Sequence, residues 1–364
     1  MKHVLQAGLG LWAMIASVTW AQEPVDRLRL PPGFGIEVYA RVPGARSLAL
    51  GSRGTVFVGT LQAGRVYALP PPAPGARAEP VVIADGLSAP SGVAFREGAL
   101  YVAEIGRILR FDDIERRLQR PPAPVVVTDR YPRDRHHGWK FIAFGPDGWL
   151  YVPVGAPCNV CEPARDTHGL ISRIRPDGSG YEVFARGVRN SVGFDWHPET
   201  GELWFNDHGR DGLGDDLPSC ELNRAPTPGL HFGFPYCHQG DLPDPDLGAG
   251  RQCSEFTPPV WKQGGHVAPD GLRFYTGTMF PQEYRTRIFV AQHGSWNRSA
   301  KSGYRVMSVE LRSNRVIRAE PFIEGWLSGE RHWGRPVDLL VMPDGSLLVS
   351  DDFAGLVYRV RYGR

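Results

Sequence analysis

The segment KFIAFGPDGWLYVPVG, from Lys140 to Gly155, predicts two short strands joined by a tight turn. Apolar and aromatic residues fill both halves, and Pro146-Asp147-Gly148 between them is a strong turn former. A lone hairpin with this much apolar surface cannot cover itself in water. The segment therefore predicts one unit of a larger β-structure.

The same hairpin pattern recurs along the chain. Copies begin at Ser47, Gly92, Val192 and Asp338, and a looser copy with a longer connection begins at Gly271. Together with the first segment they make about six copies, most of them spaced by roughly the 40–60 residues that a propeller blade occupies. Such regular spacing indicates a repeat architecture.

Radial stacking of these units would bury their apolar faces and protect the sheet edges. Several copies are followed by a further short strand, such as GRVYAL from Gly64. We therefore predict an all-β fold, a six-bladed β-propeller with four-stranded antiparallel blades. The strand GIEVYARV from Gly35 has no nearby partner, so we expect it to pair with the last blade and close the ring. The alternative, an irregular β-sandwich, does not require this self-similarity.

Composition and net charge limit the kinds of partner that the chain is expected to bind. The chain has 364 residues, which is normal for one large all-β domain, and its formal net charge is +2. This balance gives no reason to expect nucleic acid or an anionic membrane as a partner. The 44 glycines and 33 prolines, against five methionines, favour short strands and tight turns over long helices.

The N-terminus is typical of a secretory signal peptide. Lys2 and His3 precede an apolar run from Val4 to Trp20, and Thr19-Trp20-Ala21 suits cleavage after Ala21. The alternative is a membrane anchor, but the run is short for a span, which needs about 20 apolar residues. We expect a signal peptide over 1–21, a single propeller domain over 22–364 without a membrane span, and a periplasmic or secreted protein.

Export makes disulfides the expected state of the cysteines. There are five of them, so at least one thiol stays free or pairs elsewhere: Cys158, Cys161, Cys220, Cys237 and Cys253. Cys158 and Cys161 are expected to form a disulfide, because no second Cys-x-x-Cys or thioredoxin-like context supports zinc or redox chemistry. The repeat lapses over about 207–260, a Pro-, Gly- and Cys-rich insertion that we expect to be an ordered, stapled loop.

Polar residues recur where the predicted blades begin. They are Arg46, His137, Arg189 with Asn190, His266 and Arg335. Each could be a solvated rim residue, and His136 beside His137 could simply be exposed. Blade entries converge on the central channel, however, so these side chains should meet in space. Several cations and imidazoles there would suit a ligand with more than one negative charge.

A second constellation is acidic. The loop NDHGRDGLGDDLPSCELN, from Asn206 to Asn223, combines carboxylates with glycine-exposed carbonyls, which suits a hard cation such as calcium. Asp216 and Glu221 are its candidate carboxylate ligands. The loop does not match EF-hand spacing, and an acidic solvated loop is the alternative.

Several of these motifs resemble one family. HGWKFIAFGPDGWLYVPVG, GVRNSVGF, HGRDGLGDD, HVAPDGLRFYTG and GRPVDLLVMPDGSLLVSDD are similar, in this order, to segments of the glucose/sorbosone dehydrogenase family, and most closely to its sorbosone-dehydrogenase-like branch. The resemblance covers most of the mature chain. It implies an exported six-bladed propeller that uses pyrroloquinoline quinone (PQQ) and calcium.

The resemblance also implies roles for single residues. His137 matches the general base, because counting back from the turn at Gly145 selects it over His136. Positions matching the family's cofactor-binding residues are Arg189, Asn190, His208, His266, Lys301 and Arg335, and Arg189 also reaches the catalytic groups. Gly209 and Arg210 match residues whose main-chain carbonyls hold calcium. Two positions depart from the pattern: Val337 replaces a second cofactor arginine, and Ala156 replaces an acidic residue that braces the base.

The implied chemistry is consistent with these residue types. PQQ carries three carboxylates, which would be met by Arg189, Lys301 and Arg335, and calcium would polarise its quinone as a Lewis acid. His137 would take the hydroxyl proton while the quinone takes the hydride, so that an aldose or sorbosone-like aldehyde becomes a lactone or acid. A quinone or cytochrome would then accept the electrons. The alternatives are a calcium-dependent propeller hydrolase or lactonase and a non-catalytic extracellular binding propeller.

Overall fold

A computed structural model describes residues 24–162 and 166–363. The predicted signal peptide lies outside the described residues. No helix of the described chain has the length and apolar character needed to cross a membrane.

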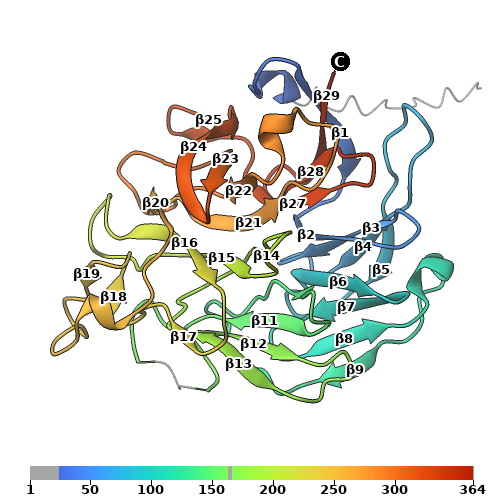
Figure 1. Ribbon diagram of the computed structural model, residues 1–364. Helices are drawn as coiled ribbons and strands as arrows, with labels where there is room; N and C mark the ends of the chain where they lie inside the picture. The colour runs from blue at the N-terminus through green and yellow to red at the C-terminus, as the bar shows by residue number, and fades with distance from the viewer. Residues whose placement is uncertain (1–23, 163–165, 364) are drawn as a thin grey trace, which may run out of the picture.

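The described chain forms a six-bladed β-propeller with four-stranded antiparallel blades, as predicted (Figure 1). The strands radiate around a common centre. Blade 1 consists of β2 (Ala45–Leu50), β3 (Val56–Thr60), β4 (Val66–Leu69) and β5 (Val81–Ala84). Blade 2 consists of β6 (Gly92–Arg96), β7 (Ala99–Ala103), β8 (Ile108–Phe111) and β9 (Val125–Thr128). Blade 3 consists of β10 (Ala143–Phe144), β11 (Leu150–Val154), β12 (Leu170–Ile174) and β13 (Glu182–Arg186). Blade 4 consists of β14 (Phe194–Trp196), β15 (Leu203–Asp207), β16 (Ser219–Ala225) and β20 (Trp261–Gly265). Blade 5 consists of β21 (Pro269–Phe274), β22 (Ile288–Gln292), β23 (Arg305–Arg312) and β24 (Arg315–Ile323). Blade 6 consists of β27 (Pro336–Val341), β28 (Leu347–Asp351), β29 (Leu356–Tyr362) and β1 (Phe34–Arg41).

Every predicted hairpin forms the first two strands of one blade. The opening segment gives β10 and β11, and the other copies give the corresponding pairs in their blades. The ring closes as expected, because β1 pairs antiparallel with β29 from Phe34↔Tyr362 to Arg41↔Leu356 (Figure 1). N-terminal and C-terminal strands therefore share blade 6.

The core lies between the blades. Six clusters of buried apolar side chains occur among the described residues, one at each interface between adjacent blades. Two carboxylates in first strands bridge blades as well: Asp195 accepts the Phe274 N–H at 2.9 Å, and Asp338 accepts the Leu48 N–H at 2.8 Å. Close approach near the axis requires glycine, since a Cβ on Gly193 would lie 2.0 Å from the Asp270 carbonyl oxygen.

The region predicted as one inserted loop over 207–260 differs from that expectation. It contains β16, a regular strand of blade 4, followed by β17 (Leu230–His231), which adds a short parallel fifth strand to blade 3. A small hairpin of β18 (Cys237–His238) and β19 (Leu242–Pro243) follows. Hydrophobic periodicity could not show these pairings, because each depends on a distant partner strand.

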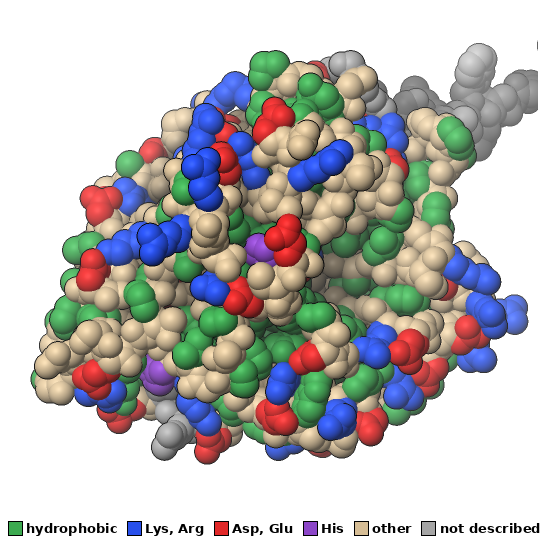
Figure 2. Space-filling model, in the orientation of Figure 1, with side chains coloured by type: hydrophobic (Ala, Val, Ile, Leu, Met, Phe, Trp, Pro, Cys, Tyr) green, Lys and Arg blue, Asp and Glu red, His purple; other side chains and the backbone are tan. Residues whose placement is uncertain are grey.

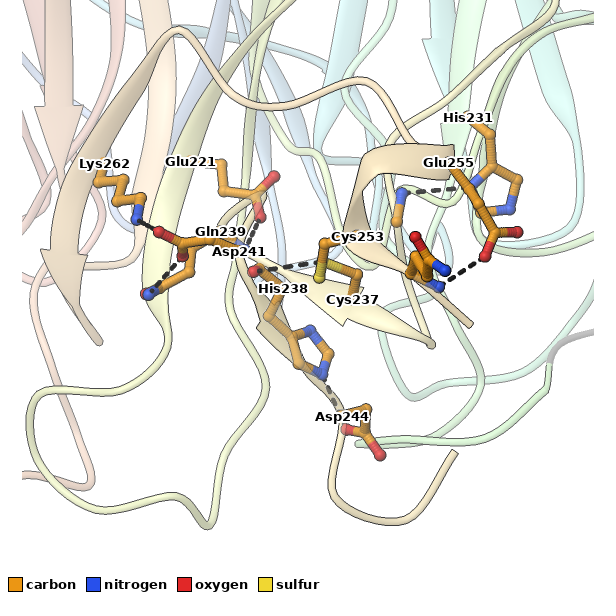
Figure 3. The surroundings of a disulfide bond; sticks show 12 residues. Glu221, His231, Cys237, His238, Gln239, Asp241, Asp244, Cys253, Glu255 and Lys262 are labelled. Atoms are coloured by element: carbon orange, nitrogen blue, oxygen red, sulfur yellow. Dashed lines mark hydrogen bonds and ion pairs between the residues drawn. A yellow bond between two sulfur atoms is a disulfide. The ribbon is translucent and has the colours of Figure 1, made fainter. Parts of the chain in front are cut away.

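The insertion is stapled, as its cysteines predicted. Cys237 and Cys253 form a disulfide beside the β18–β19 hairpin, while Glu221 accepts the Gln239 N–H at 2.6 Å and Lys262 pairs with Asp241 (Figure 3). Cys158 and Cys161 form the expected second disulfide, and Cys220 is the free thiol. The contacts of Glu221 with Gln239 and of Lys262 with Asp241 therefore hold the insertion against blade 4.

The remaining elements are short. They are the hairpin of β25 (Leu327–Ser328) and β26 (Arg331–His332) and the 3₁₀ turns η1 (Pro24–Arg27), η2 (Ile114–Arg116), η3 (Cys253–Glu255) and η4 (Gln282–Tyr284). Figure 2 shows acidic and basic side chains interspersed over one face and a hollow near its centre. This mixture agrees with the small net charge and shows no single-sign patch on that face.

Candidate active site

One cavity collects most of the predicted site residues. Its volume is about 350 Å³, within the range of small-molecule sites. The predicted residues that line it are His137, Arg189, Asn190, His208, Gly209, His266 and Arg335, together with Arg46 from the polar residues at blade entries. They come from blades 1, 3, 4, 5 and 6, so the convergence expected of blade entries occurs.

The backbone of two cavity arginines is fixed by the same device. Asp207, at the end of β15, accepts the N–H groups of Arg189 at 2.8 Å and Asn190 at 2.7 Å. Asp351, at the end of β28, accepts the Arg335 N–H at 2.9 Å. Burial raises the pKa of both carboxyl groups to about 6. In both blades, therefore, an aspartate at the end of the second strand fixes the main-chain position of the arginine that precedes the first strand.

One of the two ring nitrogens of His137 is engaged in a hydrogen bond to the main chain. Its backbone is left-handed (φ 50°), and its Nδ1–H donates to the Ala156 carbonyl oxygen at 2.9 Å. A carbonyl can only accept, so the neutral ring keeps its lone pair on Nε2. Burial, reinforced by the positive Arg189, lowers the pKa of His137 to about 2. The ring is therefore neutral at neutral pH and able to accept a proton at Nε2.

Two sequence observations near His137 are explained by this geometry. Ala156, where the resemblance places an acidic brace, orients the ring through its main-chain oxygen. His136 is solvent-exposed, with its ring centroid 4.0 Å from that of His137. The expectation that His136 is a bystander agrees with this exposure.

Arg189 is buried and is held mainly by neutral groups. Its Nε donates to the Asn159 carbonyl oxygen and its Nη2 to Asn159 Oδ1, both at 2.9 Å. The nearest ion-pair oxygen, Oδ2 of Asp211, is 3.5 Å away. Burial lowers the pKa of the Arg189 guanidinium. Its charge is therefore only weakly neutralised by the protein.

Arg46 is held by carboxylates instead. Its guanidinium pairs with Asp352 at 2.6 Å and Asp270 at 2.8 Å. His293 donates to the other oxygen of Asp352 at 2.9 Å. Asp270 and Asp352 have low pKa values, because the charge of Arg46 and the neighbouring histidine side chains outweigh the effect of burial. This network joins blades 1, 5 and 6 around the cavity.

The other predicted cavity side chains donate to main-chain oxygens, and His208 Nε2 also lies 3.3 Å from Asp270 Oδ1. His208 donates from Nε2 to the Pro269 carbonyl at 3.2 Å, and His266 donates from Nε2 to the Gly214 carbonyl at 2.8 Å. Arg335 donates to the carbonyls of His293 at 3.1 Å and Gly294 at 2.5 Å. Arg335 thus contributes a second charge that no close carboxylate balances among the described residues.

Four predicted site residues lie elsewhere. Lys301 does not line the cavity and donates to the Glu330 carbonyl at 2.6 Å. The Arg210 side chain turns toward Asp244 and Asp246 in the insertion. Lys301 and Arg210 were predicted as site residues from their positions in sequence motifs. The loops that carry them are not constrained by the blade repeat.

The two candidate carboxylate ligands of calcium do not converge. Asp216 is exposed and pairs with Arg298 at 3.0 Å, whereas Glu221 is buried and hydrogen-bonded to Asn223 and Gln239. Burial, together with the neighbouring Asp207, raises the pKa of Glu221 to about 8. Across 24–162 and 166–363, no group of three or more His, Cys, Asp or Glu could hold a metal ion. A side-chain calcium site of this kind therefore does not fit, and Gly209 and Arg210 remain candidates only through their main-chain carbonyls.

Sequence reasoning missed several cavity residues: Asp211, Asp270, Asp352, His293, Trp139, Trp296, Asn297 and Cys220. Asp270 lies within the blade motif APDG and Asp352 ends the motif SDD, so these motifs were the available signal. The three aspartates make the cavity less cationic than expected.

Three buried polar atoms on cavity-lining residues have no hydrogen-bond partner within the described structure. They are Arg46 Nε, Trp139 Nε1 and Asn297 Oδ1. An unpaired buried donor or acceptor costs about 1–3 kcal/mol, so native proteins rarely keep one without a reason. Two donors and one acceptor around one cavity fit a polar ligand with oxygen atoms.

The fold and the cavity define a propeller whose central cavity is lined by arginines, imidazoles and residues with unpaired polar atoms, a lining suited to a polar small molecule. The model of the glucose/sorbosone dehydrogenase family matches residues 103–359. The chain belongs to this family, as the motifs predicted, and is thus an oxidoreductase by family.

One sequence relative and two solved structures illustrate the similarity. An uncharacterised protein from Borreliella burgdorferi is 31% identical over 366 residues, covering 96% of this chain and 95% of its own. The PQQ domain of a pyranose dehydrogenase from Coprinopsis cinerea, in its holo form, superimposes with a TM-score of 0.78 at 17% identity, covering 92% of this chain and 97% of that one. A PQQ-bound aldose sugar dehydrogenase from Streptomyces coelicolor has a TM-score of 0.65 at 20% identity, covering 92% and 99%.

Proposed function

We propose that the protein is an exported, PQQ-dependent dehydrogenase that oxidises an aldose or a sorbosone-like aldehyde sugar to a lactone or acid. The observation that carries the proposal is that His137, whose Nδ1 is bonded to Ala156 and whose Nε2 is left free, lines the same cavity as Arg189, Arg335 and the three residues with unpaired polar atoms. Family membership and the PQQ-containing structural relatives support the cofactor. The two disulfides are consistent with the periplasm or an extracellular location.

The cavity fits an anionic, oxygen-rich cofactor. Arg189 and Arg335 would meet its carboxylates, because neither guanidinium is closely balanced by a carboxylate among the described residues. Asn190 and His208 lie beside Arg189, with 3.4 Å between Asn190 Nδ2 and His208 Nδ1. When bound, PQQ supplies the ortho-quinone that accepts a hydride. A calcium ion would have to use the main-chain carbonyls of Gly209 and Arg210 and oxygens of the cofactor.

His137 performs the proton transfer in this proposal. The substrate hydroxyl gives its proton to Nε2 as hydride leaves the same carbon, so the C–O single bond becomes a carbonyl. A ring sugar thereby yields a lactone, and an aldehyde hydrate yields an acid. The Nδ1–H bond to Ala156 keeps Nε2 directed and free. Anionic groups beside Arg189 would offset its effect on His137 and make the imidazole a stronger base.

The alternatives receive less support. A calcium-dependent hydrolase or lactonase needs carboxylates that converge on a metal, but Asp270 and Asp352 are engaged by Arg46 in the described structure. A non-catalytic binding propeller has no need for an oriented imidazole in the cavity.

The test is reconstitution of the purified protein with PQQ, with and without calcium, followed by dye reduction with a panel of aldoses and sorbosone. We expect PQQ to bind and at least one sugar to reduce the dye. Absence of PQQ binding would overturn the cofactor assignment. Binding without turnover on any sugar would overturn the substrate assignment and leave the cofactor.

The matched variant is His137→Ala. Removal of a general base lowers turnover by about 10²–10⁴-fold, while PQQ affinity should stay near that of the wild type. His136→Ala is the control, because the His136 side chain is exposed and does not line the cavity. Retained turnover in His137→Ala would show that another group is the base.

A further inference from the structure

The Cys158–Cys161 disulfide closes a short loop that touches the cavity twice. We call residues 155–161, which follow β11, the cysteine loop. Within it, the Ala156 carbonyl accepts from His137, and the Ala156 N–H donates to the Arg189 carbonyl at 2.7 Å. Asn159, between the two cysteines, contacts the Arg189 side chain. One small loop therefore contacts both the proposed base and the main cofactor arginine.

Asn159 uses both its main chain and its amide for cavity residues. Its Oδ1 accepts from Arg189 Nη2 and from the Asp211 N–H, both at 2.9 Å. Its Nδ2 donates to the Asp211 carbonyl at 3.1 Å, and its own carbonyl accepts from Arg189 Nε at 2.9 Å. Two donors of one guanidinium are thus fixed by one residue, which sets the plane of that guanidinium.

Arg189 depends on this residue because it lacks a strong alternative. Its side chain is 5% exposed, its nearest carboxylate oxygen is 3.5 Å away, and its remaining contact, to the His208 carbonyl, is 3.4 Å long. A buried guanidinium without good partners is costly and turns toward any acceptor available. Asn159 provides neutral acceptors, so it orients Arg189 without cancelling its charge.

The disulfide is what constrains Asn159. Residues 155–161 form no strand in the described structure, and the cross-link spans Asn159 directly, joining positions only 3 apart in sequence. Cross-links over short loops remove little entropy from the unfolded chain. The Cys237–Cys253 link spans 16 positions and lies in the insertion, so it should contribute more to global stability.

We infer that Asn159 is a positioning residue for Arg189 and that the Cys158–Cys161 disulfide holds it in place, so that loss of this disulfide weakens binding of the anionic cofactor. The identity of that cofactor rests on the proposed function, whereas the positioning of Arg189 does not.

The first test needs no cofactor. Amide hydrogen exchange of apo wild type is compared with Cys158→Ser/Cys161→Ser and with Asn159→Ala, following the amides of Ala156 and Asp211. We expect faster exchange at both amides in the disulfide variant and at Asp211 in Asn159→Ala, because these N–H groups donate to Arg189 and Asn159. Unchanged protection in the disulfide variant would overturn the inference whatever the cofactor is.

The second test measures PQQ affinity by fluorescence titration. We expect Asn159→Ala and Cys158→Ser/Cys161→Ser to raise the Kd about tenfold, with little change in Tm. The control Cys237→Ser/Cys253→Ser should lower Tm and keep the Kd.

The outcomes separate the two proposals. Wild type that binds no PQQ overturns the proposed function, and the exchange experiment then decides the inference alone. Wild type that binds PQQ with variants of equal Kd overturns the inference and leaves the proposed function intact. A Kd change equal in both disulfide variants would also contradict it, since it would show a general loss of structure.

Discussion

Arg46 and Arg189 line the same cavity and are equally buried, but they are held in opposite ways. Arg46 lies between two carboxylates at 2.6 and 2.8 Å, whereas Arg189 rests on the amide and carbonyl of Asn159. Burial opposes both charges; Asp270 and Asp352 nevertheless raise the pKa of Arg46, while the pKa of Arg189 is lowered. Arg46 thus links blades of the propeller, whereas the charge of Arg189 stays available for a ligand.

Removing Arg46 should have the largest effect on stability. Arg46→Met leaves Asp270 and Asp352 buried without their shared cation, and breaking a buried ion pair on one side costs about 3–5 kcal/mol. The free energy of unfolding, from denaturant titration of the apo-protein, measures this loss. A loss well below 1 kcal/mol would show that the network of carboxylates is not structural.

Removing Arg189 should affect the ligand more than the fold. Arg189→Met is expected to raise the PQQ Kd about a hundredfold, because each hydrogen bond to a charged group is worth about 1.5–3 kcal/mol. Its unfolding free energy should fall less than that of Arg46→Met, since in the described structure the nearest ion-pair oxygen of the Arg189 guanidinium is 3.5 Å away. Equal stability losses in the two variants would remove the distinction between the two arginines.

Acid titration tests the Arg189 side of the comparison through His137. Histidine titrates near 6.5 in the unfolded chain, while the pKa of His137 is about 2 in the fold. The unfolded state therefore takes up a proton first, so this contribution to stability is complete above pH 6.5 and is lost as pH falls toward 2. The slope is about 1.4 kcal/mol per pH unit for one proton.

The two arginines should differ in this titration. Arg189 is the second cause of the low pKa, after burial, and Arg46 is not among the causes. Arg189→Met should therefore raise the pKa of His137, followed by NMR of its ring, and Arg46→Met should not. His137→Asn should remove about one proton from the slope of the unfolding free energy between pH 6.5 and 4. An unchanged slope would contradict the buried, neutral state of His137.

Much of the fold could be predicted because the repeat is local. Each hairpin carries its own turn signal, and one blade supports the interpretation of the next, so all six pairs and the closing strand were correct. The insertion could not be predicted in the same way. The partner of β17 is β13, and no periodicity in Leu230–His231 identifies it.

The site could be predicted where the blade repeat fixes the backbone. His137, Arg189, Asn190 and Arg335 enter first strands, and the structure brings them to one cavity. Lys301 and Asp216 lie on loops outside this register and pair with Glu330 and Arg298 instead. The partners of Arg46 were missed because Asp270 and Asp352 are 224 and 306 positions away in sequence.

In the proposed function, this cavity binds PQQ through the charge that Arg189 retains. The most direct test of this proposal is a titration of the apo-protein with PQQ, comparing wild type, Arg189→Met and Arg189→Lys by fluorescence. We expect saturable binding of one PQQ per chain by wild type, weaker binding by Arg189→Lys and the weakest by Arg189→Met, because lysine keeps the charge but not the fork of donors held by Asn159. Equal affinity in all three proteins, or no binding by wild type, would contradict it.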